Sequence, residues 1–144
     1  VYLTSDPELV PSALFHSLKH FKVMHEQILF LHIVTEDIPR VPDSQRLLVS
    51  ARAEHVYTVT MRFGFREEPD VMAALAGLEA LGVHLEPMLT TFFSARANIT
   101  DGPGALPAWQ TALFGWMSRQ SDSAANYYRL PANKVVELGT QVSL

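Results

Sequence analysis

Four of the chain's six histidines lie within a stretch of 21 residues, LFHSLKHFKVMHEQILFLHIV. On a helix, His16 and His20 would face the same way one turn apart, which is a spacing that metal sites use. The helical zinc signature has a glutamate directly after its first histidine, whereas Ser17 stands there in this chain. A third ligand would have to come from His25 or Glu26, and no spacing fixes either side chain at a shared ion. We therefore favour a structural role for these imidazoles and keep a metal site at His16 and His20 as the alternative.

A second group of candidate residues follows two apolar segments. Ligands of open parallel sheets bind beyond the carboxyl ends of the strands, where a carboxylate can receive a cation, a ribose or an adenine amino group. Phosphate binding would favour a glycine-rich turn, and none follows either segment. We therefore favour an interpretation in which Asp6 caps a helix and the later acids are solvated loop residues. The candidates for the alternative, a ligand site, are Ser5, Asp6, Thr35, Glu36 and Asp37.

Motifs of catalysis are absent from the sequence. There is no cysteine, which excludes thiol catalysis and thiolate metal sites together. No serine stands in a Gly-x-Ser-x-Gly elbow, and neither a Walker motif nor a dinucleotide fingerprint occurs. The aromatic segment from Trp109 to Tyr128 could be a partner surface, but aromatic stripes at helical spacing are usually core. We predict that the chain is not an enzyme and uses no cofactor.

The composition is that of one compact domain. The 144 residues are 48% hydrophobic and 18% charged, with a net charge of −4. The sequence has no cluster of lysine and arginine, which argues against nucleic acid as a partner. No apolar run approaches the about 20 residues that are needed to cross a membrane. The lack of cysteine suits a reducing, cytoplasmic setting. The chain starts at Val1 inside an apolar segment, which we interpret as a cut made in a longer protein.

The first third of the chain has the pattern of a strand, a helix and a second strand. Val1–Thr4 and Gln27–Val34 are apolar and suit strands, and Ser12–Phe21 repeats apolar residues at helical spacing. This order predicts a right-handed parallel crossover. In it, His32 would be a hydrogen-bonded core histidine rather than a ligand. The residues expected at the start of the helix, as caps or in its first turn, are Ser5, Asp6 and Pro7.

The remaining chain predicts a hairpin, further helices and further strands. Leu47–Ala53 and His55–Phe65 read as an antiparallel pair. Asp70–Leu81 is the clearest helix, since Asp70 can cap it and Gly82 can stop it. Its apolar side is expected to be Val71, Leu75, Leu78 and Leu81. The other predicted segments are a connection over Thr35–Gln45, a strand over Thr90–Ala97, a loop over Thr100–Pro107, helices over Trp109–Ser118 and around Ala124–Tyr128 that Pro131 ends, and a short strand over Val135–Leu138.

These elements predict one α/β domain over residues 1–144. Its mixed sheet would have a parallel βαβ start and an antiparallel hairpin, with flanking helices. The sequence contains no repeat, low-complexity tract or linker that would divide the chain.

Three stretches of the chain match the pattern of a known family. VYLTSDPELVPSALFHSLKHFKVMHEQILFLHIVTEDIPRVP, at Val1–Pro42, is similar to Val-Phe-Leu-Thr, a proline-initiated helix, Leu-Lys-His, Lys-Val, His-Glu and Val-Thr-Glu-Asp-x-Pro-x-Val. YTVTMRFGFREEPD, at Tyr57–Asp70, fits Arg-Tyr-Gly-Phe-Met-Glu-x-Pro-Asp, and YYRLPANKVVELGTQVSL, at Tyr127–Leu144, fits Tyr-Phe-x-Ile-Pro followed by Arg-Val-Val-Glu-Leu-Gly-x-Gln-Val. The chain therefore resembles the carboxyl-terminal cytosolic domain of the Kup potassium-uptake transporters, and it departs from the pattern at Phe21 and Lys134, where asparagine and arginine are usual.

The resemblance implies that the parent protein imports potassium across the inner membrane together with protons. A membrane domain before Val1 would handle both ions. This chain would then be a regulatory and assembly domain on the cytoplasmic side, with its own transmembrane domain and a second copy of itself as partners. Some family members receive a nucleotide signal, cyclic di-AMP, so a nucleotide-sensing module is the first alternative and a metal-dependent hydrolase the second. The residues at family-pattern positions are His16, Lys19, His20, His25, Glu26, Glu36, Asp37 and Glu137.

Within this family, the histidine-rich segment is expected to be scaffold. Its polar groups would bond strand-end acids such as Glu36 or contact the membrane domain. A histidine whose pKa stays near the ordinary value of about 6.5 could also report acidification of the cytoplasm to a proton-coupled transporter.

Overall fold

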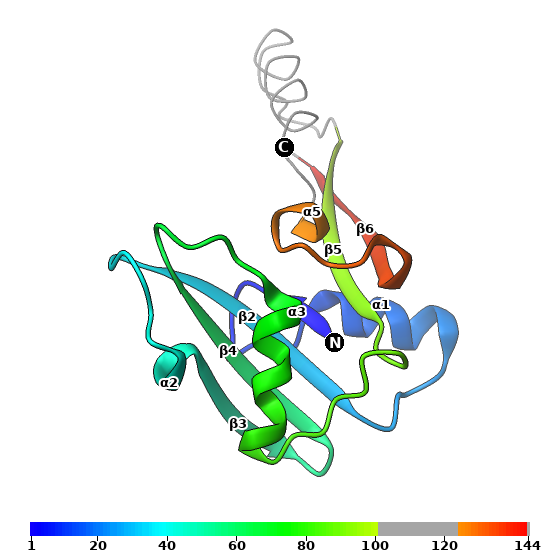
Figure 1. Cartoon of the computed structure of the whole chain (residues 1–144). Helices are drawn as coiled ribbons and strands as arrows, with labels where there is room; N and C mark the ends of the chain where they lie inside the picture. Colours follow the sequence, from blue (N-terminus) through cyan, green and yellow to red (C-terminus); the bar gives the residue numbers. More distant parts are fainter. Residues whose placement is uncertain (101–123, 144) are drawn as a thin grey trace, which may run out of the picture.

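The described part of the chain forms one mixed sheet of six strands in the order β3-β4-β2-β1-β5-β6 (Figure 1). The computed structural model describes residues 1–100 and 124–143. The helix expected over Trp109–Ser118 and most of the loop before it lie outside the described residues. The strands are β1 (Tyr2–Thr4), β2 (Ile28–Glu36), β3 (Leu47–Ala53), β4 (Val56–Gly64), β5 (Phe92–Thr100) and β6 (Val135–Ser143), and the helices are α1 (Ser12–Phe21), α2 (Asp43–Arg46), α3 (Val71–Leu75) with η1 (Ala76–Leu81), α5 (Ala124–Tyr127) and η2 (Ala132–Lys134).

The predicted parallel βαβ start is confirmed. β1 and β2 pair in parallel, with Tyr2 opposite Phe30 and Thr4 opposite His32, and α1 connects them. The predicted hairpin is also confirmed, because β3 and β4 pair antiparallel along their length. His55 turns the chain between these two strands in the left-handed region, at φ 59°. The other strand pairs among the described residues are parallel.

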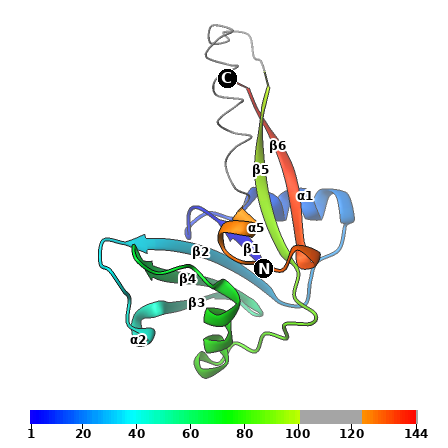
Figure 2. The same cartoon turned by 45° about the horizontal axis from the view of Figure 1, so that its top comes forward.

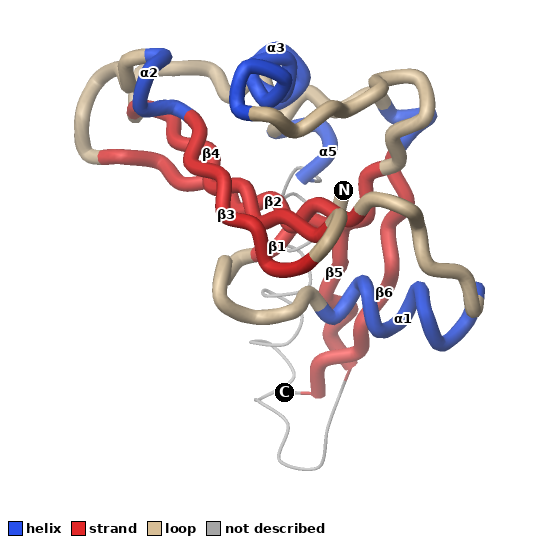
Figure 3. The backbone as a smooth tube through the Cα atoms, turned by 90° about the horizontal axis from the view of Figure 1, so that it is seen from below, coloured by secondary structure: helices blue, strands red, loops and turns tan. Residues whose placement is uncertain are grey.

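Helices α1 and α3 cover opposite faces of the sheet (Figure 3). Side chains of β2 alternate between the faces, so Leu29 and Leu31 pack on the α3 side while Ile28 and Phe30 pack on the α1 side. The α3 side carries the larger core: Val59, Met61, Phe63, Val71, Leu75, Leu78, Val83, Phe92 and Leu130. The core on the α1 side is Tyr2, Ala13, Leu14, Ile28, Phe30 and Phe93.

The helix predicted over Ser12–Phe21 is confirmed as α1, but the residues expected to cap it or to form its first turn, Ser5, Asp6 and Pro7, are wrong. α1 begins at Ser12 after Pro11, and no side chain caps it. Asp6 instead accepts a hydrogen bond from the backbone N–H of Glu8 at 2.8 Å, which closes a turn. Pro7 lies in this turn. The sequence therefore contains a turn signal between Ser5 and Glu8 that resembles a helix cap.

The helix expected over Asp70–Leu81 is present, but it changes type. The Asp70 carboxylate accepts from the backbone N–H of Ala73 at 3.0 Å, and Gly82 ends the helix at φ 82°. From Ala76 the turns are 3-10 rather than α. The sequence predicts Leu81 on the buried side, but its side chain is 51% exposed, because it is the last residue before Gly82 turns the chain away.

Strands β5 and β6 leave the rest of the sheet. β5 pairs with β1 only where Tyr2 lies opposite Phe93, whose rings stack with centroids 4.6 Å apart. β5 and β6 then continue together, and Figure 2 shows them projecting beyond β1. β6 is therefore longer than the Val135–Leu138 strand that the sequence predicts. None of the described helices is long and apolar enough to span a membrane.

Gly64, at the end of β4, shows how tightly the neighbouring loop packs. A Cβ atom at this position would lie 2.4 Å from the carbonyl oxygen of Pro39 and 2.6 Å from Cα of Arg40. Both are backbone atoms, so no side chain can move aside. Only glycine fits here without displacing the loop after β2.

We predict that Gly64→Ala lowers the free energy of unfolding by about 2 kcal/mol or more, because the loop must shift to admit the methyl group. Urea denaturation followed by circular dichroism measures the change. Gly77→Ala is the matched control, since its Cβ would meet only Leu47 Cδ1, at 3.1 Å. The control should change stability by no more than about 1 kcal/mol, and equal losses in the two variants would refute this view of Gly64.

Candidate functional site

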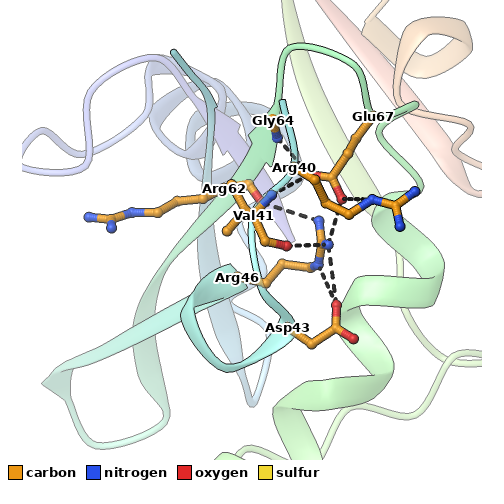
Figure 4. Close-up of polar contacts among 7 residues, drawn as sticks. All are labelled: Arg40, Val41, Asp43, Arg46, Arg62, Gly64 and Glu67. Atoms are coloured by element: carbon orange, nitrogen blue, oxygen red, sulfur yellow. Dashed lines mark hydrogen bonds and ion pairs between the residues drawn. The ribbon is translucent and has the colours of Figure 1, made fainter. Parts of the chain in front are cut away.

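The most completely bonded carboxylate of the described chain is Glu67, in the loop after β4 (Figure 4). Its Oε2 accepts from the backbone N–H of Gly64 at 2.6 Å and from that of Val41 at 3.0 Å. Its Oε1 accepts from Nη2 of Arg46 at 2.8 Å. The side chain is only 11% exposed. Glu67 therefore joins two loops that follow neighbouring strands.

Arg46 completes this cluster from α2. Its Nη2 also donates to the carbonyl oxygen of Val41 at 2.9 Å, and its Nε donates to Oδ1 of Asp43 at 3.2 Å. Nη1 lies 3.4 Å from the carbonyl oxygen of Arg62. The guanidinium stands 5.2 Å from the centroid of the Phe63 ring, within the range of a cation–π contact. The polar atoms of Arg46 and Glu67 thus form their hydrogen bonds with other groups of the protein.

The cluster has a clear electrostatic signature. The hydrogen bond from Arg46, followed by those from the Val41 and Gly64 backbone, lowers the pKa of Glu67 to about 2. Two backbone bonds run beside it, from Phe65 N–H to Ile38 O at 3.0 Å and from Arg66 N–H to Pro39 O at 3.2 Å. We call Glu67, Arg46 and these two bonded loops the loop lock.

Sequence reasoning missed both charged members of the loop lock. It singled out Glu36 and Asp37, but Asp37 is exposed, and Glu36 forms an ion pair with Arg62 at 3.4 Å on the strand surface. The signal that could have found Glu67 is its place in RFGFREEPD, where it falls on the glutamate of the family pattern. No such signal marks Arg46, because α2 has no apolar periodicity.

A cavity of about 620 Å³ opens beyond the carboxyl end of β1. It exists because β1 ends at Thr4, whereas β2 runs on to Glu36 and β5 runs on to Thr100. The gap lies between strands whose crossover helices cover opposite faces, which is where open parallel sheets bind ligands. We call it the β1 crevice, and its lining residues are Leu3, Thr4, Ser5, Asp6, Leu9, Val10, Pro11, Ser12, Leu31, His32, Ile33, Ser94, Ala95 and Tyr128.

Polar groups of the β1 crevice differ in how they are bonded. Asp6 is fixed by its backbone, because Thr4 Oγ1 donates to Asp6 O at 2.8 Å and accepts from Asp6 N–H at 3.2 Å. Nδ1 of His32 lies 3.2 Å from the carbonyl oxygen of Thr4. Ser94 also lines the crevice and is only 7% exposed.

The structure brings together only some of the predicted ligand residues. Ser5 and Asp6 line the β1 crevice, together with His32. Thr35, Glu36 and Asp37 do not line it, because β2 carries them past the level at which β1 stops. A ligand in the crevice would meet the first two candidates and not the last three.

His16 and His20 lie on α1 with their rings parallel and their centroids 6.3 Å apart. Among residues 1–100 and 124–143, no three His, Cys, Asp or Glu side chains are placed to share a metal ion. His25 and Glu26 lie at the opposite end of the sheet from Asp6, in a second cavity of about 440 Å³, because α1 runs back along the sheet. His25 contacts Phe93 there, with centroids 5.7 Å apart. Lys19 is exposed on α1, and Glu137 on β6 lies opposite Ser94 of β5.

We predict that Glu67→Gln lowers the free energy of unfolding by about 3 kcal/mol, because the Arg46 side chain is 15% exposed and would keep only the exposed Asp43 as its counter-charge among the described residues. The pKa of Glu67 is lowered from 4.5 to about 2, so this carboxylate stabilises the fold fully above about pH 4.5. That contribution is lost as the pH falls towards 2. Stability curves at a series of pH values should show this loss in the unaltered chain and not in Glu67→Gln.

Glu68→Gln is the matched control for this prediction. The side chain of Glu68 is 76% exposed and forms an ion pair with Arg129. Removing an exposed pair of this kind should cost no more than about 1 kcal/mol. A Glu68 variant as unstable as the Glu67 variant would contradict the assignment of the loop lock to Glu67.

The whole chain, residues 1–144, matches the family described as K+ potassium transporter C-terminal domain. It is 43% identical over 145 residues to "Probable potassium transport system protein Kup 1" of Paramagnetospirillum magneticum, covering 100% of this chain and 23% of that protein. It is 45% identical over 143 residues to "Probable potassium transport system protein Kup" of Nitrobacter hamburgensis, covering 99% of this chain and 22% of that protein. No solved structure matches. The chain spans less than a quarter of the length of these relatives, and it belongs to the family of potassium transporter C-terminal domains.

Proposed function

We propose that the chain is the regulatory and assembly domain, on the cytoplasmic side, of a proton-coupled potassium uptake transporter. The observation that carries this proposal is the match of the whole chain to the C-terminal part of potassium transport proteins. The domain itself would not transport potassium. Potassium and protons would be handled by a membrane domain elsewhere in the parent protein, and that membrane domain is the first partner of this chain.

The loop lock supports a role in transmitting force rather than in chemistry. Its charged groups are bonded to one another and to backbone, so they hold the carboxyl ends of β2 and β4 together. Two of the family-pattern segments, VTEDIPRV and RFGFREEPD, meet in this lock. A rigid edge of this kind would let the domain pass a change at one surface to the transporter. Homodimer formation by the parent belongs to the same proposal.

The test is rubidium uptake by the parent transporter in cells that lack other potassium uptake. We expect Glu67→Gln to change the uptake rate, or its response to potassium or pH, at unchanged membrane abundance, while Glu68→Gln behaves as the unaltered protein. Truncation of the parent just before Val1, which removes the present domain, should have a larger effect of the same kind. If the variants and the truncated protein all transport rubidium at the rate of the unaltered protein, at equal abundance, a regulatory role is overturned. Assembly would then be the remaining role of the domain.

A nucleotide-sensing module is the second candidate function, and the β1 crevice favours it. The crevice is large enough for a nucleoside, and its lining includes the hydroxyl-bearing residues Thr4, Ser5 and Ser94. The start of α1 lies at its rim, with Ser12 exposed there, so a phosphate group could approach the helix N-terminus. Ser5 and Asp6 would contact the same ligand.

We predict that Ser12→Asp abolishes nucleotide binding without loss of stability, because the new carboxylate would repel phosphate but suits the first turn of a helix. Calorimetric titration of the unaltered chain and the variant with cyclic di-AMP, AMP and ATP measures the binding of each nucleotide. Ser44→Asp is the matched control, since Ser44 is exposed on α2 outside the crevice. No saturable heat with any of these nucleotides would exclude this candidate and leave the first proposal intact.

Two smaller proposals remain from the histidines of α1. A metal-dependent hydrolase using His16 and His20 would retain a metal ion after purification without a histidine tag, which metal analysis detects. Sensing of cytoplasmic pH by the same pair would make the pH dependence of transport change in a His16→Gln, His20→Gln variant. Unchanged pH dependence would exclude that role.

A further inference from the structure

The outer side of α1 and the turns at its two ends form a surface with an unusual mixture of side chains. Six of the thirteen large apolar side chains that are exposed in the described residues fall between Leu9 and Met24. Phe15 is 61% exposed and Met24 is 65% exposed. We call this the α1 outer surface, and its members are Leu9, Val10, Phe15, Lys19, His20, Phe21, Lys22, Val23 and Met24.

This surface does not serve the core of the described chain. α1 turns Ala13, Leu14 and Ser17 towards the sheet, where they are buried. Ser17 accepts a hydrogen bond from the hydroxyl of Tyr2 at 3.3 Å, which fixes the rotation of the helix. Figure 3 shows α1 on the side of the sheet opposite α3. Leu18 packs against the same core, whereas Phe15, Lys19, His20 and Phe21 are exposed.

The charge of the α1 outer surface has the opposite sign to that of the whole chain. The chain has a net charge of −4, but the segment from Leu9 to His25 contains no Asp or Glu. The same segment contains two of the three lysines, Lys19 and Lys22. The nearest acid before it, Glu8, forms an ion pair with Arg52 at 3.3 Å. The ionisable side chains between Leu9 and His25 are therefore lysines and histidines, and the nearest acid after them is the exposed Glu26.

We propose that the α1 outer surface binds the anionic headgroup layer of a membrane. Long lysine side chains can place the ammonium group at lipid phosphates while their stems lie beside apolar groups, and exposed aromatic side chains enter the boundary between headgroups and acyl chains. A helix on the outside of a sheet is convex and offers no pocket for a peptide. A flat anionic layer suits such a shape.

A second copy of this chain fits the surface less well. A two-fold contact brings the same patch of both copies together, so Lys19 and Lys22 of one copy would face those of the other without an acid in the segment to pair them. Like charges placed opposite each other disfavour association. The proposal goes beyond the regulatory function above and does not depend on it.

The test is flotation of the chain with vesicles of seven parts phosphatidylcholine to three parts phosphatidylglycerol. We expect binding to these vesicles and much weaker binding to phosphatidylcholine alone. Each lysine close to an anionic surface strengthens binding by about five-fold, so Lys19→Gln should weaken it about five-fold. Lys19→Gln combined with Lys22→Asn should weaken it about 25-fold. Asparagine is chosen because Lys22 has a φ of 54°, which asparagine tolerates.

Two matched controls distinguish binding by this surface from an effect of total charge or of exposed apolar area elsewhere. Arg66→Gln removes one exposed positive charge from the loop lock edge and should leave binding unchanged. Phe15→Ser should weaken binding, whereas Leu89→Ser, at a side chain that is 79% exposed elsewhere, should not. Raising the salt from about 0.05 M to about 0.5 M should release the unaltered chain.

Three results would overturn the proposal. One is no binding to the anionic vesicles, and another is equal binding to both vesicle types. The third is a dimer in sedimentation that Phe15→Ser or Lys19→Gln converts to a monomer, because a second copy would then occupy the surface. Thermal melts of every variant show that a loss of binding is not a loss of folding.

Discussion

The brevity of β1 is the constraint on which the rest of the structure depends. This strand lies at the centre of the sheet but spans only Tyr2–Thr4. Because it stops early, β5 can pair with it at Tyr2 alone and then leaves the sheet together with β6. The same early stop opens the β1 crevice between β2 and β5. A longer central strand would close the crevice and hold β5 in the sheet, so the shape of the domain follows from a turn at Ser5.

The carboxyl ends of β2 and β4 extend past the point where β1 stops. Polar bonds, and not a neighbouring β1, hold these ends in place. Glu67 satisfies two backbone N–H groups and one guanidinium at once, and the absence of a side chain at Gly64 lets the loop pack against β4. A buried carboxylate is stabilising only when its partners are complete. The loop lock meets that condition, whereas the β1 crevice encloses an open volume of about 620 Å³ lined by polar and apolar side chains. The contrast separates a site that holds the fold from a site that can receive a molecule.

Local patterns in the sequence predict the elements well and the site poorly. Apolar periodicity suffices for the βαβ start, the hairpin and the Asp70 helix, since each depends on residues close in sequence. The bounds of α1 are predicted correctly but its cap is not, because Asp6 accepts from the N–H of Glu8 in a turn, which from sequence alone looks like a cap. The Arg46–Glu67 pair joins residues 21 positions apart, and nothing in the spacing of charges reveals which of many acids and bases will meet. The crevice depends on where β1 ends relative to β2 and β5, which is a property of register.

The crevice and the α1 outer surface share a mechanical connection. The loop from Ser5 to Pro11 forms one wall of the crevice and leads directly into α1. Arg52 of β3 ties this loop to the hairpin, since its Nη2 donates to Pro7 O at 2.7 Å and its Nε donates to Thr58 Oγ1 at 3.1 Å. Arg52 thus holds the loop on its hairpin side, and the chain continues on the other side into the helix that carries Phe15 and Lys19. One short segment therefore determines both the wall of the crevice and the position at which α1 begins.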